Sequence, residues 1–308
     1  MAAIEDLTGV LPALISPLQA DGTVDEAAAG RLVEHVIAGG VTGLLALGST
    51  GETASLDEKA RRTMLSTVVA AAAGRVPVIC GVAQSHLAAA RIEMEAGARL
   101  GAAAALVAPP FYYPMDQTTL IAFYRQLVKG SPLPILLYNI PQNTKVVAEP
   151  ATVAALATEG TIAGIKDSSR DFEYFEAVCI ATRALPQFRI FTGSDSMLLP
   201  SLAMGAAGTI CATANVSPAW VVRVYDAFGR GDLVGARADQ DALFQLAMAL
   251  RGGVFPAAIK SACHLLGICE AWCAAPVQPL DDQSEATLRD RLEAWGVLTP
   301  TAPKPASK

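Results

Sequence analysis

Several features that would place a sequence in a common class are scarce or absent in this 308-residue chain. No apolar run approaches the roughly 18 residues that a membrane-crossing helix needs. The first residues, Met1 to Asp6, lack the basic start and apolar stretch of a secretory signal peptide. We therefore expect a soluble, cytoplasmic protein with no membrane partner.

Positive charge and metal-binding patterns are scarce as well. The chain has 23 lysines and arginines against 29 aspartates and glutamates, a formal net charge of -6, and no basic cluster. This balance argues against nucleic acid and anionic membranes as partners. The three histidines are scattered, and the six cysteines form no Cys-x-x-Cys pair. We expect buried free thiols in preference to disulfides or a metal site, and no metal or other cofactor.

Apolar residues, in contrast, are abundant. They make up 52% of the sequence, charged residues make up 17%, and the mean hydropathy is +0.39. The chain can therefore bury a large core. Its length suits two ordinary domains or one large α/β barrel.

Short apolar segments alternate with helical patterns over about the first 230 residues, which favours a closed (β/α)8 TIM barrel with eight strand–helix units. The competing doubly wound sheet usually has a glycine-rich nucleotide turn after its first strand, and here Ser16-Pro17-Leu18-Gln19 follows instead. The predicted strands are 10–18, 43–47, 76–82, 103–108, 134–138, 161–166, 189–192 and 209–211. The predicted helices are one capped by Asp25 and ended by Gly39, then 57–73, 87–100, 117–128, 150–158, 172–184 and 197–204.

The alternation stops after Gly229. Helical patterns at 233–250, 256–266 and 284–295 follow without intervening strands. We predict an α/β barrel domain over 1–230 and a C-terminal helical region over 231–298 that packs on the barrel or builds a subunit contact. A disordered proline- and lysine-rich tail is expected over 299–308.

One strand-end residue, Lys166, indicates a specific chemistry. It closes the run 161–165, which is small, apolar and β-branched, as in a strand buried on both faces. Desolvation at the tip of such a strand favours the neutral amine. A neutral amine in a pocket can attack a ketone and form a Schiff base. The alternative is an ordinary surface lysine just past a strand end.

Other polar residues follow the predicted strands, where TIM barrels build their active sites. Ser49 and Thr50, flanked by glycines, offer hydroxyls and backbone N–H groups suited to a small carboxylate. Tyr138 ends the fifth strand, and its hydroxyl can shuttle protons for a nearby amine. The remaining strand-end residues expected at this pocket are Tyr112, Tyr113, Gly193, Ser194 and Asp195.

Three of these segments resemble the motifs of one known family. The segments are Gly48-Ser49-Thr50-Gly51-Glu52, Tyr138-Asn139-Ile140-Pro141 and Gly164-Ile165-Lys166-Asp167, with the lysine 28 residues after the tyrosine. In order and spacing they are similar to the motifs of the dihydrodipicolinate synthase/N-acetylneuraminate lyase family. The resemblance covers the chain from about Gly9 to Leu298.

This resemblance implies roles for individual residues. Lys166 would form the Schiff base, Tyr138 would be the general acid/base, and Ser49 would belong to a hydroxyl relay that Tyr112 joins from a neighbouring subunit. Thr50 and the backbone of Ile210 would hold the carboxylate of pyruvate or another 2-oxo acid. The resemblance also implies a homotetramer, built as a dimer of dimers.

The sequence departs from the synthase branch of that family. That branch binds the carboxylate of aspartate semialdehyde with an arginine at the position where this chain has Asn143. A neutral amide cannot replace a bidentate guanidinium. Its lysine feedback uses a glutamate and a tyrosine where this chain has Ala89 and Phe111. The sialic-acid lyase branch places a carboxylate pair after strand seven, of which Asp195-Ser196 keeps half.

We therefore predict a Schiff-base class I lyase, an aldolase or dehydratase. Its substrates would be pyruvate with a small aldehyde, or a 2-oxo acid such as a 2-oxo-3-deoxy sugar acid or 4-hydroxy-2-oxo acid. Asn143, Gly193, Asp195 and Ser196 are expected to contact the substrate. One alternative is a 4-hydroxy-tetrahydrodipicolinate synthase that condenses pyruvate with aspartate semialdehyde. Others are a non-catalytic metabolite-binding pseudoenzyme and a barrel for phosphorylated substrates, although residues 212–216 lack a glycine-rich phosphate cup.

Overall fold

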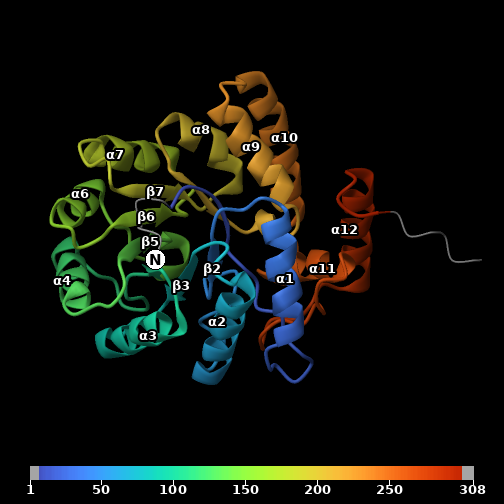
Figure 1. Cartoon of the computed structure of the whole chain (residues 1–308), viewed down its shortest axis with the longest axis horizontal. Helices are drawn as coiled ribbons and strands as arrows, with labels where there is room; N and C mark the ends of the chain where they lie inside the picture. Colours follow the sequence, from blue (N-terminus) through green and yellow to red (C-terminus); the bar gives the residue numbers. More distant parts are fainter. Residues whose placement is uncertain (1–6, 300–308) are drawn as a thin grey trace, which may run out of the picture.

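The computed structural model describes residues 7–299 and contains one eight-stranded parallel sheet, ringed by helices (Figure 1). The strands are β1 (Gly9–Pro12), β2 (Leu44–Ala46), β3 (Val78–Val82), β4 (Ala104–Val107), β5 (Ile135–Asn139), β6 (Gly164–Asp167), β7 (Arg189–Thr192) and β8 (Gly208–Cys211). From β2 to β8 each strand pairs with its sequence neighbours, and β1 pairs with β8. The Leu14 N–H donates to the Leu45 carbonyl at 2.9 Å beside a parallel Ala13–Leu45 bridge, which joins β1 to β2. This closes the predicted (β/α)8 TIM barrel.

Aspartates begin many of the helices. Asp25, Asp57, Asp116 and Asp171 each accept a hydrogen bond from the backbone N–H three residues later, which satisfies a donor that the helix itself leaves unpaired. The helices are α1 (Glu26–Ala38), α2 (Glu58–Ala72), α3 (Leu87–Leu100), α4 (Gln117–Val128), α5 (Pro141–Thr144), α6 (Pro150–Thr158), α7 (Phe172–Thr182), α8 (Leu198–Ala203), α9 (Pro218–Gly229), α10 (Leu233–Ala249), α11 (Ala257–Leu265) and α12 (Asp282–Ala294). Two 3-10 turns, η2 (Asp195–Met197) and η3 (Thr213–Asn215), follow β7 and β8.

The strands divide the core into two layers. Leu136, Tyr138 and Ile140 belong to a cluster inside the barrel, whereas Leu137 packs in the layer between the sheet and the helices. This alternation is the period of two that a strand imposes on its side chains. Tyr138 therefore points into the barrel, and its register partner on β6 is Lys166.

The C-terminal region contacts the barrel. Helix α10 packs on α9, and α11 packs on α12 and on η3 (Figure 1). The Arg31 side chain in α1 donates to the Ile268 carbonyl at 3.0 Å. The division at residue 230 remains a prediction, and most of the predicted tail, 300–308, lies outside the described residues.

Helix and strand ends differ locally from the sequence prediction. The first strand ends at Pro12, and the rest of the predicted segment 10–18 is its exit, beginning with the isolated bridge at Ala13. Helix α5 lies within a stretch that the sequence predicts as turns, and Pro141 starts it. All six cysteines are free, and five of them are buried.

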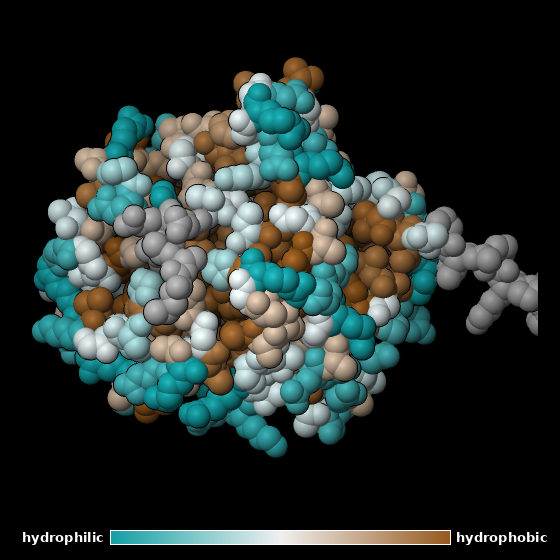
Figure 2. Space-filling view, in the orientation of Figure 1, coloured by the Kyte–Doolittle hydropathy of each residue, from teal (hydrophilic) through white to brown (hydrophobic). Residues whose placement is uncertain are grey.

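The surface is mixed in character. Hydrophilic residues cover much of the outer rim, and hydrophobic residues show between the helices (Figure 2). Within residues 7–299 no helix combines the length and apolarity needed to cross a membrane.

Candidate active site

The amine of Lys166 lies inside the barrel at the carboxyl end of β6. Lys166 is only 3% exposed to solvent. The Tyr138 hydroxyl on the neighbouring strand β5 lies 3.5 Å from Lys166 Nζ, and Nζ sits 4.5 Å from the centroid of the Tyr138 ring. Parallel pairing of β5 with β6 brings these two residues together, although 28 positions separate them in the chain. This excludes the surface-lysine alternative.

Ser49 extends this pair into a line of polar groups. Its hydroxyl lies 3.4 Å from the Tyr138 hydroxyl, in the turn that follows β2. Both separations are long for hydrogen bonds. Catalytic hydrogen bonds are often long without substrate and tighten in the complex. The arrangement can pass a proton from the amine through Tyr138 to Ser49.

Gly193 gives the Lys166 side chain its space. A Cβ atom at position 193 would lie 2.9 Å from Lys166 Cε and 2.0 Å from Ser168 Oγ. Real side chains do not approach so closely, so Lys166 can adopt this position only beside a glycine. The sequence placed Gly193 at the pocket without indicating this steric reason.

A cavity of about 380 Å³ surrounds the amine. Most of the residues that the sequence assigned to the site line it, and three do not. Tyr112 and Tyr113 are 83% and 72% exposed and pack edge-on against each other. The third is Ser196, whose hydroxyl lies 3.0 Å from that of Ser194. The predicted residues that line the cavity are Ser49, Thr50, Tyr138, Asn143, Lys166, Gly193, Ser194, Asp195 and Ile210.

Asp195 is already engaged within the protein. Its Oδ1 atom accepts hydrogen bonds from the hydroxyl and, at 3.3 Å, from the backbone N–H of Thr213. Thr213 begins η3 after β8. Because its backbone N–H donates to Asp195, this N–H is not free to bind a phosphate. Burial, and secondly the negative charge of Asp195, raise the pKa of the Cys211 thiol.

Glu52 and Lys260 form a buried ion pair that the sequence did not predict. The Lys260 side chain is 0% exposed and that of Glu52 is 5% exposed. Lys260 Nζ also donates to the Trp272 carbonyl at 2.6 Å, and Glu52 Oε1 accepts from the Ala274 N–H at 2.7 Å. The pair ties the turn that carries Ser49 to the C-terminal region. A lysine in the mostly apolar helix α11 is the sequence signal that could have revealed it.

Comparison with known proteins identifies the chain. The model of the dihydrodipicolinate synthetase family matches residues 6–295. The chain belongs to this family. It is 38% identical over 292 residues to the 4-hydroxy-tetrahydrodipicolinate synthase of Hyphomonas neptunium, an alignment that covers 94% of this chain and 99% of that protein. It is 35% identical to an uncharacterized DapA-like lyase of Halobacterium salinarum, over 95% of each chain.

Solved structures of the dihydrodipicolinate synthetase family share the fold. YagE, a prophage protein of E. coli K12 solved in complex with pyruvate, superposes with a TM-score of 0.91 at 28% identity, over 95% of this chain and 99% of YagE. The dihydrodipicolinate synthase of Bacteroides thetaiotaomicron gives 0.90 at 34% identity, over 94% and 99%. The chain is therefore a lyase of this family.

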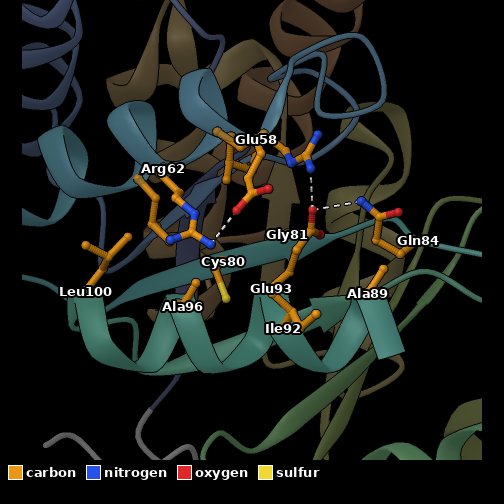
Figure 3. Close-up of a pocket in the computed structure, with 14 residues that line it drawn as sticks. Glu58, Arg62, Cys80, Gly81, Gln84, Ala89, Ile92, Glu93, Ala96 and Leu100 are labelled. Atoms are coloured by element: carbon orange, nitrogen blue, oxygen red, sulfur yellow. Dashed lines mark hydrogen bonds and ion pairs between the residues drawn. The ribbon is translucent and has the colours of Figure 1, made fainter. Parts of the chain in front are cut away.

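A second cavity, of about 160 Å³, lies between α2 and α3 (Figure 3). Ala89, where the resemblance places the feedback glutamate of the synthase branch, contributes only a methyl group to it. Glu93 in this cavity is held by Arg61 and by Gln84, each at 2.8 Å. Its charge is therefore neutralised within the protein.

Proposed function

We propose that this protein is a Schiff-base class I lyase whose Lys166 bonds covalently to pyruvate or another 2-oxo acid. The observation that carries this proposal is the buried amine 3.5 Å from the Tyr138 hydroxyl, with Ser49 next in line. The pyruvate complex of the related YagE supports a 2-oxo acid as substrate. The assignments of individual residues that follow are part of the proposal.

The reaction begins at Lys166 Nζ, which attacks the C2 carbonyl of the 2-oxo acid. As the C–N bond forms, Tyr138 protonates the former carbonyl oxygen and gives a carbinolamine. Loss of that oxygen as water leaves an iminium ion. Thr50 and the backbone of Ile210 hold the carboxylate with neutral hydrogen-bond donors, and Ser49 relays protons between Tyr138 and a tyrosine, Tyr112, from a neighbouring subunit.

The iminium ion is the electron sink for bond cleavage. In an aldolase, Tyr138 removes the proton of the C4 hydroxyl, the C3–C4 electron pair moves toward the iminium, and an aldehyde leaves an enamine on Lys166. In a dehydratase, C3 loses a proton and the enamine then expels the C4 hydroxyl as water. Protonation of the aldolase enamine at C3 restores the imine, and hydrolysis of the imine in either case frees the lysine.

The substrate we favour is a hydroxylated 2-oxo acid, of the 2-oxo-3-deoxy sugar acid or 4-hydroxy-2-oxo acid type. Asn143 supports this choice, since an amide can contact hydroxyl groups but cannot bind a carboxylate as a guanidinium does. Gly193, Asp195 and Ser196 complete the predicted contacts with the substrate. The 4-hydroxy-tetrahydrodipicolinate synthases among the relatives favour one second candidate, condensation of pyruvate with aspartate semialdehyde. Homotetramer formation and a cytoplasmic location belong to the same proposal.

Borohydride trapping tests the proposal. Wild-type protein incubated with pyruvate and borohydride is expected to gain the mass of a reduced pyruvate adduct on the peptide that contains Lys166. The variant Lys166→Ala should gain nothing while keeping its circular dichroism spectrum. An adduct that persists in this variant would refute the role of Lys166, and its absence from the wild type with every 2-oxo acid would favour a pseudoenzyme.

A further inference from the structure

Two arginines line the same cavity as Lys166. Arg170 lies in the loop between β6 and α7, and Arg251 follows α10. Both side chains are exposed, so they lie where the cavity opens to solvent. In the part of the chain that the structure describes, neither guanidinium forms an ion pair or a hydrogen bond.

Arginines elsewhere in the fold do find partners. Arg61, Arg75 and Arg125 each pair with a glutamate at 2.5–2.8 Å. Arg170 also has a left-handed backbone, with φ of +64°. Residues with a Cβ seldom adopt this conformation, and strained backbone of this kind is frequent at ligand-binding positions.

The two arginines are close enough to affect each other. Burial, and secondly the charge of Arg170, lower the pKa of Arg251, while Asp195 acts in the opposite direction. Within residues 7–299 Asp195 forms no ion pair with Arg170 or Arg251. Its Oδ1 atom instead accepts hydrogen bonds from Thr213. This side of the cavity therefore favours a bound anion.

We propose that Arg170 and Arg251 form a subsite for a carboxylate at the end of the substrate remote from its 2-oxo group. The substrate held at Lys166 is then a dicarboxylate. Lys166 is buried, whereas both arginines are exposed residues of the same cavity, so the arginines act on another part of the bound molecule. This inference rests on the proposed function and narrows it.

The geometry favours a carboxylate over a phosphate. A guanidinium presents parallel N–H donors that match paired oxygens of either a carboxylate or a phosphate. A phosphate would also use free backbone N–H groups at a turn, but the Thr213 N–H at the start of η3 is donated to Asp195.

Matched 2-oxo acids test the subsite. Borohydride trapping on Lys166 is titrated with 2-oxoglutarate against 2-oxopentanoate, and with 2-oxoadipate against 2-oxohexanoate; each pair differs only in its terminal carboxylate or methyl group. We expect the diacid of at least one pair to reach half-maximal trapping at a concentration about 10- to 100-fold lower, the range for hydrogen bonds to a charged group. Arg170→Gln and Arg251→Gln should each reduce that ratio toward one.

Controls separate this inference from the proposed function. Trapping by pyruvate, which has no second carboxylate, should fall far less than trapping by the preferred diacid in both variants, and it should be unchanged in Arg230→Gln, an exposed arginine outside the cavity. If pyruvate is trapped normally but neither diacid is preferred, the subsite inference is overturned and the proposed function stands. If no 2-oxo acid is trapped by the wild type, both are overturned. A stronger, arginine-dependent preference for 2-oxo-4-phosphonobutanoate would overturn the carboxylate assignment.

Discussion

The ion pair between Glu52 and Lys260 gives the sharpest prediction for stability. The Glu52 Oε2 atom accepts no hydrogen bond from residues 7–299, so the ammonium of Lys260 is the charge that balances it. Both side chains are almost completely shielded from water. Removal of one partner leaves the other charge buried without a counter-charge.

The magnitude follows from this burial. Breaking a buried ion pair by removal of one partner costs about 3–5 kcal/mol. Domains are typically stable by only about 5–15 kcal/mol. Lys260→Met, which keeps the side-chain volume, should therefore bring the protein near its stability limit. With an unfolding slope near 3 kcal/mol/M, the urea midpoint should fall by about 1 M or more.

A double-mutant cycle isolates the pair. Glu52→Gln keeps an oxygen for the Ala274 N–H but leaves the Lys260 ammonium unbalanced, so it should cost a similar amount. The double variant Glu52→Gln/Lys260→Met buries no charge. We expect it to be more stable than the sum of the single variants predicts, by about 2–3 kcal/mol, the upper range of measured coupling between residues in contact.

The exposed pair between Arg75 and Glu34 serves as the control. Glu34→Gln should leave the urea midpoint almost unchanged, because exposed ion pairs contribute little to stability. Urea unfolding at one fixed protein concentration, followed by fluorescence and circular dichroism, measures all five proteins. Additive effects in the cycle, or a loss below about 1 kcal/mol for Lys260→Met, would show that this pair does not hold the Ser49 turn to the C-terminal region.

Three further predictions concern the reaction. Tyr138→Phe should slow turnover by about 10²–10⁴, the usual contribution of acid–base catalysis, and unchanged kinetics would assign the proton to another group. Gly193→Ala should suppress borohydride trapping even though Lys166 is present, because the new Cβ would lie 2.9 Å from Lys166 Cε; normal trapping would show that the lysine can move aside. Asn143→Arg should shift the preference among aldehydes toward aspartate semialdehyde in a kcat/KM comparison, and an unchanged preference would remove this loop from substrate selection.

The sequence was sufficient to predict the fold and to single out Lys166 and Tyr138, which the structure brings together. Eight alternations of apolar segments with helical patterns predicted the barrel, and aspartates at Asp25 and Asp57 marked helix starts that the structure confirms. Lys166 and Tyr138 were recognisable because both end apolar strands, and parallel strands bring their carboxyl ends to one face. These inferences depend on local patterns, which a sequence displays directly.

Other features depend on residues that are distant in the chain and become neighbours only when the barrel closes. Glu52 forms an ion pair with Lys260, and the Thr213 hydroxyl donates a hydrogen bond to the carboxylate of Asp195. Arg251 and Arg170 line the same cavity. The periodicity of apolar residues in the sequence does not predict such pairings, because each results from packing between separate elements. The sequence by itself therefore determined the architecture and the chemistry at Lys166, whereas the tertiary structure decided which charges are balanced inside the protein and which remain available to a substrate.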